Sequence, residues 1–269
     1  MNILEAIVKD KKEELSKIKS KISLDEIQNR EAYHRTSISI TEALLKPGSS
    51  GIIAEFKRHS PSKGDIHKGA NCLQITQGYA KEGAAAISIL TETKYFKGND
   101  EDLMQGRKSE FTPILRKDFM VDAFQFYEAK SLGADVVLLI ASILSKSQTK
   151  EFLDLAHSLG MQVILEIHNE KELENNWTQG VDIVGVNNRD LTTFQVNVET
   201  SFRLAKIIPK TSFKISESGI SHPEMILKLK DAGYNGFLIG EPFMKEANPP
   251  LALKEFISSI QSLKSNLGT

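Results

Sequence analysis

The sequence of 269 residues has a single cysteine, Cys72, which excludes an internal disulfide framework and a metal site built from several thiolates. Its formal net charge is only −1 and it has no long basic tract, so nothing points to nucleic acid or an anionic membrane as a partner. No apolar run approaches the roughly 20 residues that cross a bilayer, and the first residues lack the layout of a secretory signal. These absences favour a reducing, cytoplasmic setting and small-molecule partners.

Motifs of metal, nucleophile and dinucleotide chemistry are missing as well. The six histidines are scattered, without a His-x-x-x-His or comparable ligand pair. There is no Gly-x-Ser-x-Gly nucleophile elbow, and no Gly-x-Gly-x-x-Gly turn follows the first apolar run. We therefore expect neither a metal ion nor a cofactor.

What the sequence does contain is a regular alternation of short apolar runs with amphipathic segments. Eight runs rich in Ile, Val and Leu predict strands at 51–57, 85–90, 113–117, 135–140, 162–167, 182–186, 212–216 and 236–239. Helices are predicted between and after them, at 73–82, 123–132, 146–158, 170–177, 199–207, 222–232 and 251–262. Eight such units predict an α/β fold, a (β/α)₈ TIM barrel, with an open doubly wound sheet as the alternative that periodicity leaves open.

The first 48 residues differ from the rest. Residues 3–22 are rich in Lys and Glu with apolar residues at helical spacing, and Ser23 followed by Glu26 predicts a capping box that opens a second helix. Because acidic residues are interleaved with the lysines, a membrane-binding or calmodulin-type helix is disfavoured. We expect residues 1–48 to be a helical extension packed on a barrel of residues 49–269.

Charged residues recur where the odd-numbered strands end. Each of these charged residues is an even number of positions away from an apolar residue of its own strand, so the two side chains share a face and should point inward together. The charged residues are Glu55, Lys57, Lys117, Glu166 and Glu217. Any one of them could be a satisfied charge at a strand end. Alternate strands of a barrel contribute to a common layer, however, so the set predicts one acid–base cavity. We expect a lysine held away from water there to donate protons more readily near neutral pH.

A phosphate site is the second expectation. Ser218-Gly219 follows the seventh predicted strand and Gly240-Glu241 follows the eighth, the two turns that often bind phosphate in such barrels. Each is a weak pattern alone, because a glycine after a strand is commonly a simple turn residue. The connection from Arg58 to Asn71 is long, which predicts a loop that covers a substrate.

Six segments together resemble the motif series of the indole-3-glycerol phosphate synthase family. In order along the chain they are Glu55-Phe56-Lys57-Arg58-His59-Ser60-Pro61-Ser62, Leu90-Thr91-Glu92-Thr93-Lys94-Tyr95-Phe96, Leu115-Arg116-Lys117-Asp118-Phe119, Leu165-Glu166-Ile167-His168, Gly185-Val186-Asn187-Asn188-Arg189-Asp190-Leu191 and Ser216-Glu217-Ser218-Gly219-Ile220. The resemblance implies a carboxy-lyase of tryptophan biosynthesis. Its reaction closes the ring of 1-(2-carboxyphenylamino)-1-deoxyribulose 5-phosphate, with loss of carbon dioxide and water, to give indole-3-glycerol phosphate.

The same resemblance implies roles for individual residues. Lys117 matches the principal general acid and Glu166 the general base of the family, and Lys57 matches a second lysine to which acid roles are also assigned. Further catalytic or hydroxyl-contacting positions are Glu55, Asn187, Glu217 and Ser218, and substrate-binding positions are Ser60, Pro61, Phe96, Phe119, Arg189, Gly219, Gly240 and Glu241. The family often has a small hydroxyl residue in place of Glu241. We expect Glu241 to bind phosphate through its backbone N–H, with its carboxylate turned away.

Other functions stay open at this point. Another phosphate-binding barrel enzyme, such as phosphoribosylanthranilate isomerase, would share the two glycine turns but would not need two inward lysines. A barrel retained for sensing or assembly would be favoured by loss of the acid–base set, which is intact here. We expect a phosphorylated aromatic small molecule as substrate and a monomer or weak oligomer, with association with other tryptophan-pathway enzymes as an open alternative.

Overall fold

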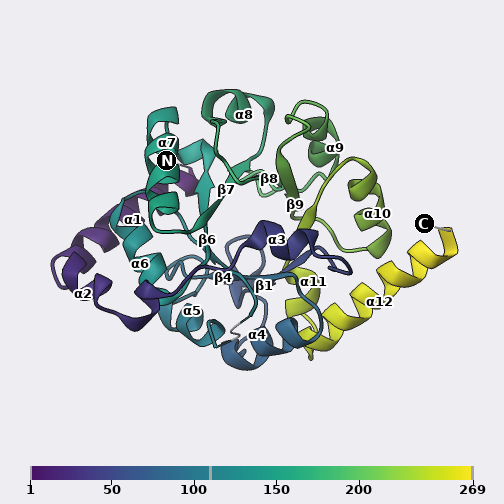
Figure 1. Ribbon diagram of the computed structural model, residues 1–269, viewed down its shortest axis with the longest axis horizontal. Helices are drawn as coiled ribbons and strands as arrows, with labels where there is room; N and C mark the ends of the chain where they lie inside the picture. Colours follow the sequence, from purple (N-terminus) through teal and green to yellow (C-terminus); the bar gives the residue numbers. More distant parts are fainter. Residues whose placement is uncertain (1, 109–110, 268–269) are drawn as a thin grey trace.

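The computed structural model describes residues 2–108 and 111–267, and its centre is a closed barrel of parallel strands (Figure 1). The strands follow one another around the barrel in the order β1-β10-β9-β8-β7-β6-β5-β4. Their bounds are β1 Ile52–Phe56, β4 Ala86–Leu90, β5 Ile114–Lys117, β6 Val136–Ile140, β7 Gln162–Ile167, β8 Ile183–Asn187, β9 Phe213–Glu217 and β10 Gly236–Ile239. Because Ala54 of β1 pairs with both Ile87 of β4 and Ile239 of β10, the sheet closes. The barrel prediction is confirmed and the open sheet is wrong.

Buried side chains alternate between two cores, as the period of two requires. Ile53, Leu115, Ile164 and Ile215 belong to the cluster that fills the barrel. The residues between them in sequence pack outward against the surrounding helices, as Val163 and Leu165 do. The charged residues that continue the inward parity are therefore directed into the barrel at its carboxyl end.

Six of the eight strands differ by one residue at one or both ends from the predicted bounds. Asp135 and Asp182, predicted as first residues of strands, instead precede β6 and β8. Their carboxylates accept the backbone N–H groups of Ile114 and Val163 on neighbouring strands. At these positions side-chain capping replaces pairing within the sheet.

Helices surround the barrel, and all seven predicted helices are present with ends that differ by up to five residues. They are α4 Cys72–Lys81, α6 Phe124–Leu132, α7 Lys146–Ser158, α8 Glu170–Asn176, α9 Glu199–Ala205, α10 Pro223–Asp231 and α12 Pro249–Leu267. Sequence analysis missed α5 (Asp100–Gly106) and the four-residue α11 (Glu241–Met244). Both are shorter than the window over which helical periodicity is readable. None of the helices in the described ranges is long and apolar enough to cross a membrane.

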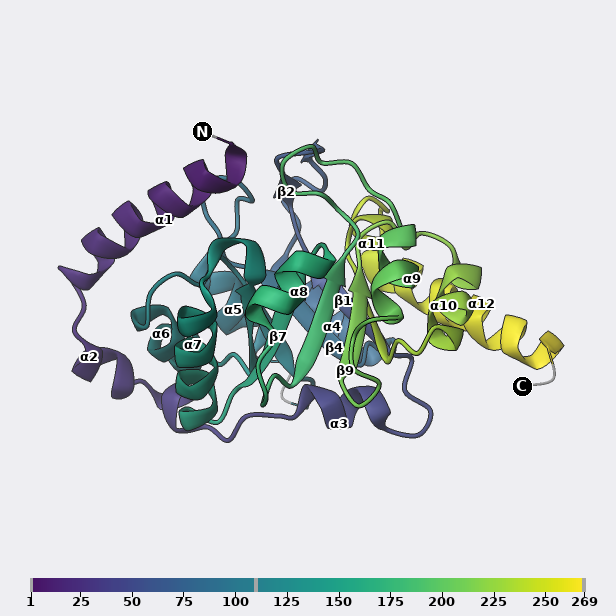
Figure 2. The same cartoon turned by 90° about the horizontal axis from the view of Figure 1, so that it is seen from above.

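The segment before β1 covers two ends of the barrel (Figure 2). Helix α1 (Ile3–Lys19) lies on the side of the carboxyl ends of the strands, whereas α3 (Ile40–Leu45) lies beneath the amino ends. Between them are α2 (Leu24–Gln28), opened by the predicted capping box of Ser23 and Glu26, and the short 3₁₀ helix η1 (Glu31–His34). The division of the chain into a helical extension of residues 1–48 and a barrel of residues 49–269 stays a prediction. Ile40 and Leu44 belong to the same core as the barrel interior.

The long loop after β1 has structure of its own. It contains a small hairpin, β2 (His59–Ser60) paired antiparallel with β3 (Gly64–Asp65). An ion pair joins Arg58, where the loop begins, to Asp102 of α5, and Lys97 Nζ lies 2.6 Å from Asp65 Oδ1. These contacts fasten the loop to α5 and to the segment that precedes α5, above the mouth of the barrel.

Candidate active site

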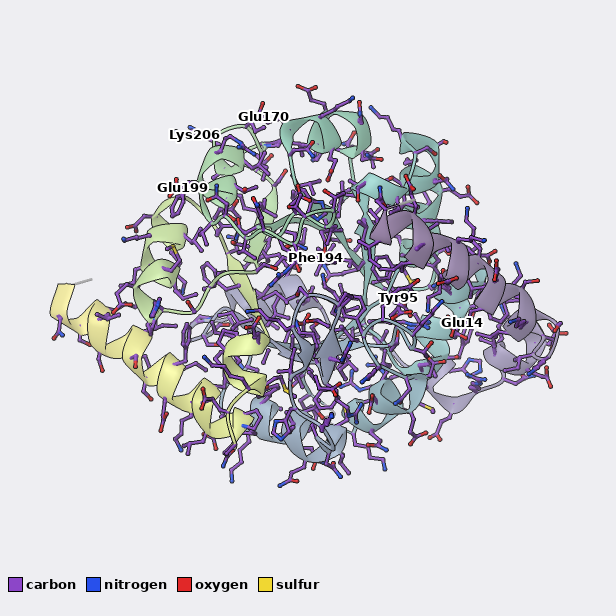
Figure 3. All side chains as sticks on the ribbon, turned by 180° about the vertical axis from the view of Figure 1, so that it is seen from behind. Glu14, Tyr95, Glu170, Phe194, Glu199 and Lys206 are labelled. Carbon is purple, nitrogen blue, oxygen red and sulfur yellow. The ribbon has the colours of Figure 1, made fainter. Side chains whose placement is uncertain are left out.

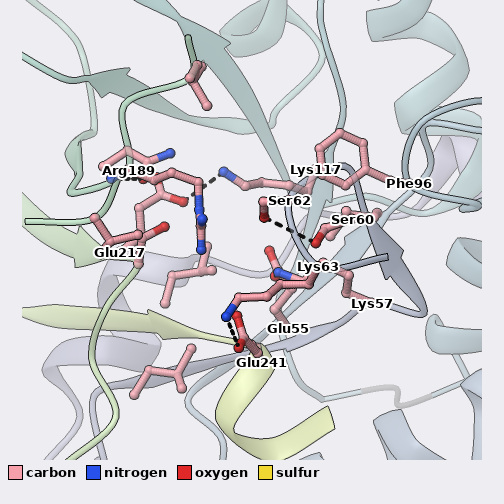
Figure 4. A pocket seen from close by; sticks show the side chains of 18 of the residues that line it. Glu55, Lys57, Ser60, Ser62, Lys63, Phe96, Lys117, Arg189, Glu217 and Glu241 are labelled. Carbon is pink, nitrogen blue, oxygen red and sulfur yellow. Dashed lines mark hydrogen bonds and ion pairs between the residues drawn. The ribbon is translucent and has the colours of Figure 1, made fainter. Parts of the chain in front are cut away.

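A cavity of about 520 Å³ opens at the carboxyl ends of the strands. The structure places all fifteen predicted site residues on its wall, namely Glu55, Lys57, Ser60, Pro61, Phe96, Lys117, Phe119, Glu166, Asn187, Arg189, Glu217, Ser218, Gly219, Gly240 and Glu241. Figure 4 shows Lys117, Arg189 and Glu217 on one side of this space and Lys63 and Glu241 on another. The residues are far apart in sequence, and closure of the barrel brings them together.

Lys117, the last residue of β5, lies at the centre of the charged cluster. Its Nζ atom is 2.7 Å from Glu166 Oε2 and 2.8 Å from Glu217 Oε2. Burial favours a neutral amine, but the charges of Glu166 and Glu217 outweigh it and raise the pKa of Lys117. The expectation that burial would ease proton release is therefore wrong. The two carboxylates hold the ammonium charged.

The two carboxylates that contact Lys117 differ in their own protonation. Burial, and then the neighbouring charge of Glu166, raises the pKa of Glu217 to about 8. Burial acts in the same sense on Glu166, but Lys117 and His168 outweigh it and hold the pKa of Glu166 well below its usual range. Near neutral pH the cluster thus contains an ionised Glu166 and a protonated Glu217 around one ammonium.

Glu55 and Lys57 form a second pair beside the first. Glu55 is 4% exposed near the end of β1, and Lys57 Nζ, one residue beyond that strand, donates a hydrogen bond to its Oε1 atom. A Cβ atom at position 240 would lie 2.5 Å from this same oxygen. Gly240 thus provides the space that the Glu55 carboxylate occupies, in addition to any contact with a ligand.

The polar turn after β8 connects to Glu166. Asn187 Nδ2 donates to Glu166 Oε1 at 3.2 Å, while Asn187 Oδ1 accepts the backbone N–H of Arg189 at 3.0 Å. The Arg189 guanidinium donates to the carbonyl of Phe194 at 3.2 Å. Seen onto the carboxyl face, Phe194 lies over the middle of the barrel (Figure 3). Asn187 therefore orients both the Glu166 carboxylate and the start of the loop that follows β8.

An aromatic wall lies on the side of β4 and β5. The ring centroids of Phe96 and Phe119 are 6.2 Å apart. Phe96 is held by the buried Glu92, whose Oε2 atom accepts the backbone N–H groups of Tyr95 and Phe96 at 2.7 and 2.9 Å. Helix α1 contacts the same loop, because Tyr95 donates to Asp10 at 2.5 Å and Thr93 donates to Glu14 at 3.1 Å; Figure 3 labels Tyr95 and Glu14 in this region.

The opposite wall is a backbone turn in a rare conformation. Ser218 and Gly219 have φ values of 68° and 76°, and a Cβ atom at Gly219 would lie 2.6 Å from Val196. A non-glycine residue at positive φ is strained and needs support from its surroundings. Buried Asn188 supplies it by donating to the carbonyl of Ser218 at 3.0 Å.

Lys63 completes this wall from the hairpin loop. Its Nζ atom is 3.2 Å from Glu241 Oε1, and both side chains line the cavity (Figure 4). The Glu241 carboxylate has a cation as its neighbour in this structure. Its expected orientation with phosphate bound stays a prediction.

Four residues with a part in the site were missed as contributors by sequence analysis, namely Lys63, Glu92, His168 and Asn188. Glu92, His168 and Asn188 stand inside the recognised motifs, so proximity to the predicted residues was an available signal. Lys63 follows Ser60-Pro61-Ser62, but its ion pair spans 178 positions from residue 63 to residue 241 and has no local signature. Within the part of the chain that the structure describes, no group of three or more His, Cys, Asp or Glu side chains is arranged to hold a metal ion.

The fold and the cavity define a (β/α)₈-barrel enzyme with a cluster of acidic and basic side chains at the carboxyl ends of its strands. The family model described as indole-3-glycerol phosphate synthase matches residues 4–256, and the chain belongs to that family.

Individual relatives agree with this assignment. Indole-3-glycerol phosphate synthase of Bacteroides thetaiotaomicron is 45% identical over 260 residues, which cover 97% of this chain and 99% of that protein. The enzyme of the same name from Caldanaerobacter subterraneus is 44% identical over 259 residues, with coverage of 96% and 99%. Among solved structures, thiamine phosphate pyrophosphorylase from Pyrococcus furiosus is similar with a TM-score of 0.57 at 14% identity, over 79% of this chain and 95% of that one. That last likeness concerns the fold alone.

Proposed function

We propose that this protein is a carboxy-lyase that converts 1-(2-carboxyphenylamino)-1-deoxyribulose 5-phosphate to indole-3-glycerol phosphate, carbon dioxide and water, in tryptophan biosynthesis. The observation that carries the proposal is the position of Lys117 between Glu166 and Glu217 in a cavity with an aromatic wall and a glycine-turn wall. Family membership supports the same reaction.

Lys117 serves as the general acid for ring closure in this proposal. As the aromatic carbon attacks the ribulose carbonyl, negative charge develops on the carbonyl oxygen, and the ammonium donates a proton to it. The raised pKa of Lys117 does not oppose this step, because an alkoxide is a stronger base than an amine. Carbon dioxide then leaves as the ring regains aromaticity.

Dehydration needs a second acid and a base. The hydroxyl leaves as water after protonation, and the protonated Glu217 and Lys57 are the proposed donors among the residues of the cavity wall. Glu166 accepts the proton that is lost as the five-membered ring becomes aromatic. Its Oε1 atom is oriented by Asn187, which supports a role in positioning the base.

The two ends of the substrate match the two walls. Phe96, Phe119 and Pro61 are proposed to pack on the anthranilate ring, with Arg189 and Ser60 near its carboxylate. The phosphate is proposed to lie at Ser218, Gly219, Gly240 and Glu241. Lys63 adds a positive charge at that end. It is free to exchange its ion pair with Glu241 for one with phosphate, because 52% of its side chain is exposed.

The setting of the reaction is also part of the proposal. We propose a monomer or a weak oligomer as the catalytic unit. The one cysteine, Cys72, is buried and unpaired, which supports a reducing cytoplasmic setting. Association with other tryptophan-pathway enzymes is a separate possibility to be tested by co-purification.

The direct test is to incubate the purified protein with the carboxyphenylamino substrate and to follow indole-3-glycerol phosphate by its absorbance or fluorescence. Product formation that depends on enzyme concentration, with one carbon dioxide released per indole formed, is the expected result. Isomerisation of phosphoribosylanthranilate without indole formation would instead identify the alternative barrel enzyme. No turnover of either substrate by a folded protein would contradict the proposal.

A further inference from the structure

His168 lies directly behind Glu166, outside the cavity wall. It follows the last residue of β7, and its side chain is 11% exposed. Its Nδ1 atom is 2.9 Å from Glu172 Oε2, and its Nε2 atom is 3.3 Å from Glu166 Oε1. The imidazole thus stands between two carboxylates, one of which is the proposed base.

The carboxylate of Glu172 holds the imidazole in place. Its Oε2 atom accepts both the backbone N–H of His168 at 2.8 Å and the ring Nδ1–H, while its Oε1 atom accepts the Asn169 side-chain amide at 2.8 Å. Glu172 belongs to the first turn of α8, whose N-cap is Asn169. The start of the helix therefore fixes which way the ring faces.

The geometry favours protons on both ring nitrogens. An ionised carboxylate only accepts hydrogen bonds, so Nδ1 must donate to Glu172. Nε2 faces Glu166 Oε1 and has no well-aligned partner among the described residues, so a lone pair there would oppose the Glu166 charge. Glu166 itself accepts from Lys117 and Asn187, as an ionised carboxylate does.

We propose that His168 is a positioning residue that is a permanent imidazolium and that keeps the proposed base Glu166 ionised and oriented between turnovers. The expected effect of His168 on the pH dependence of kcat/KM rests on the proposed function. The charge of His168 in the substrate-free protein does not. The groups that face the imidazolium are Glu166 and Glu172, and behind Glu166 lie Lys117 of β5 and Glu217 of β9. Without the imidazolium, Lys117 would be the one cation among the described residues that contacts the Glu166 carboxylate.

Electrostatics agrees with this geometry. Burial would lower the pKa of His168, but the negative charge of Glu166, together with the charge and hydrogen bond of Glu172, raises it to about 10. The same interaction helps to lower the pKa of Glu166. His168 thus extends the pH range over which Glu166 is ready to accept a proton, and it favours release of that proton once accepted.

The structural arm of the test uses the substrate-free protein. The imidazole resonances are followed by ¹H–¹³C NMR against pH, and His168 is assigned by the signal that disappears in His168→Gln. We expect that signal to remain that of an imidazolium well above the ordinary value of 6.5. Titration of His168 at or below that value would overturn the inference, whatever the enzyme's activity.

The kinetic arm compares the pH dependence of kcat/KM in the wild type and in His168→Gln, which keeps an N–H donor but removes the charge. We expect the acid limb to move to higher pH by about one unit or more, with KM at the optimum within about twofold. His157→Gln is the matched control. The His157 imidazole lies 2.8 Å from the carboxylate of Asp182, at the amino end of β8 and away from the cavity, so this variant also removes an imidazole–carboxylate contact. It should leave the profile unchanged.

The remaining outcomes are also decisive. An unmoved acid limb in folded His168→Gln would overturn the positioning role. If that variant does not fold, Glu172→Gln is used instead, because it keeps the imidazole and weakens its contact with residue 172. In that variant we expect NMR to show a lower pKa of His168, and we expect the acid limb of kcat/KM to move to higher pH. No shift in either measurement with Glu172→Gln would overturn the inference. A wild type that forms no indole-3-glycerol phosphate refutes the proposed function, and the NMR arm still decides the charge of His168.

Discussion

The two ends of the barrel both bury charged groups, but they differ in how completely those groups are paired. At the amino end, the fully buried Asp135 accepts from Arg35, from Arg107 and from the backbone N–H groups of Ile38 and Ile114. All of these partners belong to the protein. The carboxylate is left with no obvious capacity for a ligand.

At the carboxyl end the pairing is incomplete. Glu217 Oε1 and His168 Nε2 are buried without a well-aligned partner among the described residues, although Glu217 Oε2 contacts the Lys117 ammonium and the His168 ring lies beside Glu166. Unsatisfied buried polar atoms cost free energy and concentrate where a substrate or a proton is handled. The comparison concerns the acidic groups: the Asp135 carboxylate is filled by partners from the chain, although Arg35 Nε beside it has none in the described part of the chain, whereas Glu217 in the cavity wall keeps an oxygen without a partner there.

The largest expected effect is on catalysis at the carboxyl end. Lys117→Ala and Glu166→Gln should each lower kcat by about 10³-fold with a much smaller change in KM, because each removes a group that acts in the transition state. The measurement is steady-state formation of indole-3-glycerol phosphate. Lys130→Ala is the control, since Lys130 donates to Arg35 and Ser37 away from the cavity. Near-normal kcat with only a raised KM in either site variant would refute its catalytic role.

The second effect is on folding at the amino end. Asp135→Asn should lower the free energy of unfolding by about 3 kcal/mol, because it removes the buried charge that pairs with two arginines. Turnover of the folded protein should stay within about twofold of the wild type. Urea titration measures the first quantity and the product assay the second. Asp154→Asn, which breaks an exposed pair with Lys150, should change stability by about 1 kcal/mol or less. If Asp135→Asn and Asp154→Asn lost the same free energy of unfolding, the proposed difference between the buried, fully paired Asp135 and the exposed Asp154 would be refuted.

The third effect is on the pH dependence of stability. Glu217 has a pKa of about 8 in the folded protein and an ordinary value of 4.5 when unfolded. Between these values the folded state holds the extra proton, so this group stabilises fully below 4.5 and its contribution is lost as pH rises through about 8. Glu217→Gln should flatten the fall of Tm over that window, as measured by calorimetry. The exposed Glu199→Gln should keep the wild-type slope, and an unchanged slope in Glu217→Gln would contradict the raised pKa.

The smallest effect is expected at the cavity rim. Lys63→Ala should raise KM about two- to fivefold with kcat nearly unchanged, because an exposed lysine adds a modest, screened attraction for phosphate. The increase should shrink as salt concentration rises. Lys68→Ala removes a lysine of the same loop that pairs with Asp65 outside the cavity wall, and it should leave KM unchanged. A KM for Lys63→Ala equal to that of the control would remove Lys63 from the phosphate site.

The strands and the inward charges were predictable because both follow from a period of two. Each apolar run indicated a strand, and the parity of Lys117 with Leu115 and of Glu217 with Ile215 indicated the barrel interior. The brief helix α5 was not predictable, because one apolar turn does not establish a helical period. The direction of the Lys117 pKa was predicted wrongly, because it depends on two carboxylates from other strands at less than 3 Å.

By itself, the sequence determined the eight strand–helix units and the direction of the charged side chains at the strand ends, since a local period sets which way each side chain points, and its motifs carried the family resemblance. Closure of the sheet, which that period left open, was decided by the pairing of β1 with both β4 and β10. Only the tertiary structure decided which charges are saturated and which are not. The pairing of Lys63 with Glu241, and the place of His168 between Glu166 and Glu172, depend on the paths of loops and on distances of about 3 Å. Coulomb interactions and hydrogen bonds change steeply over such distances, and no pattern along the chain encodes them.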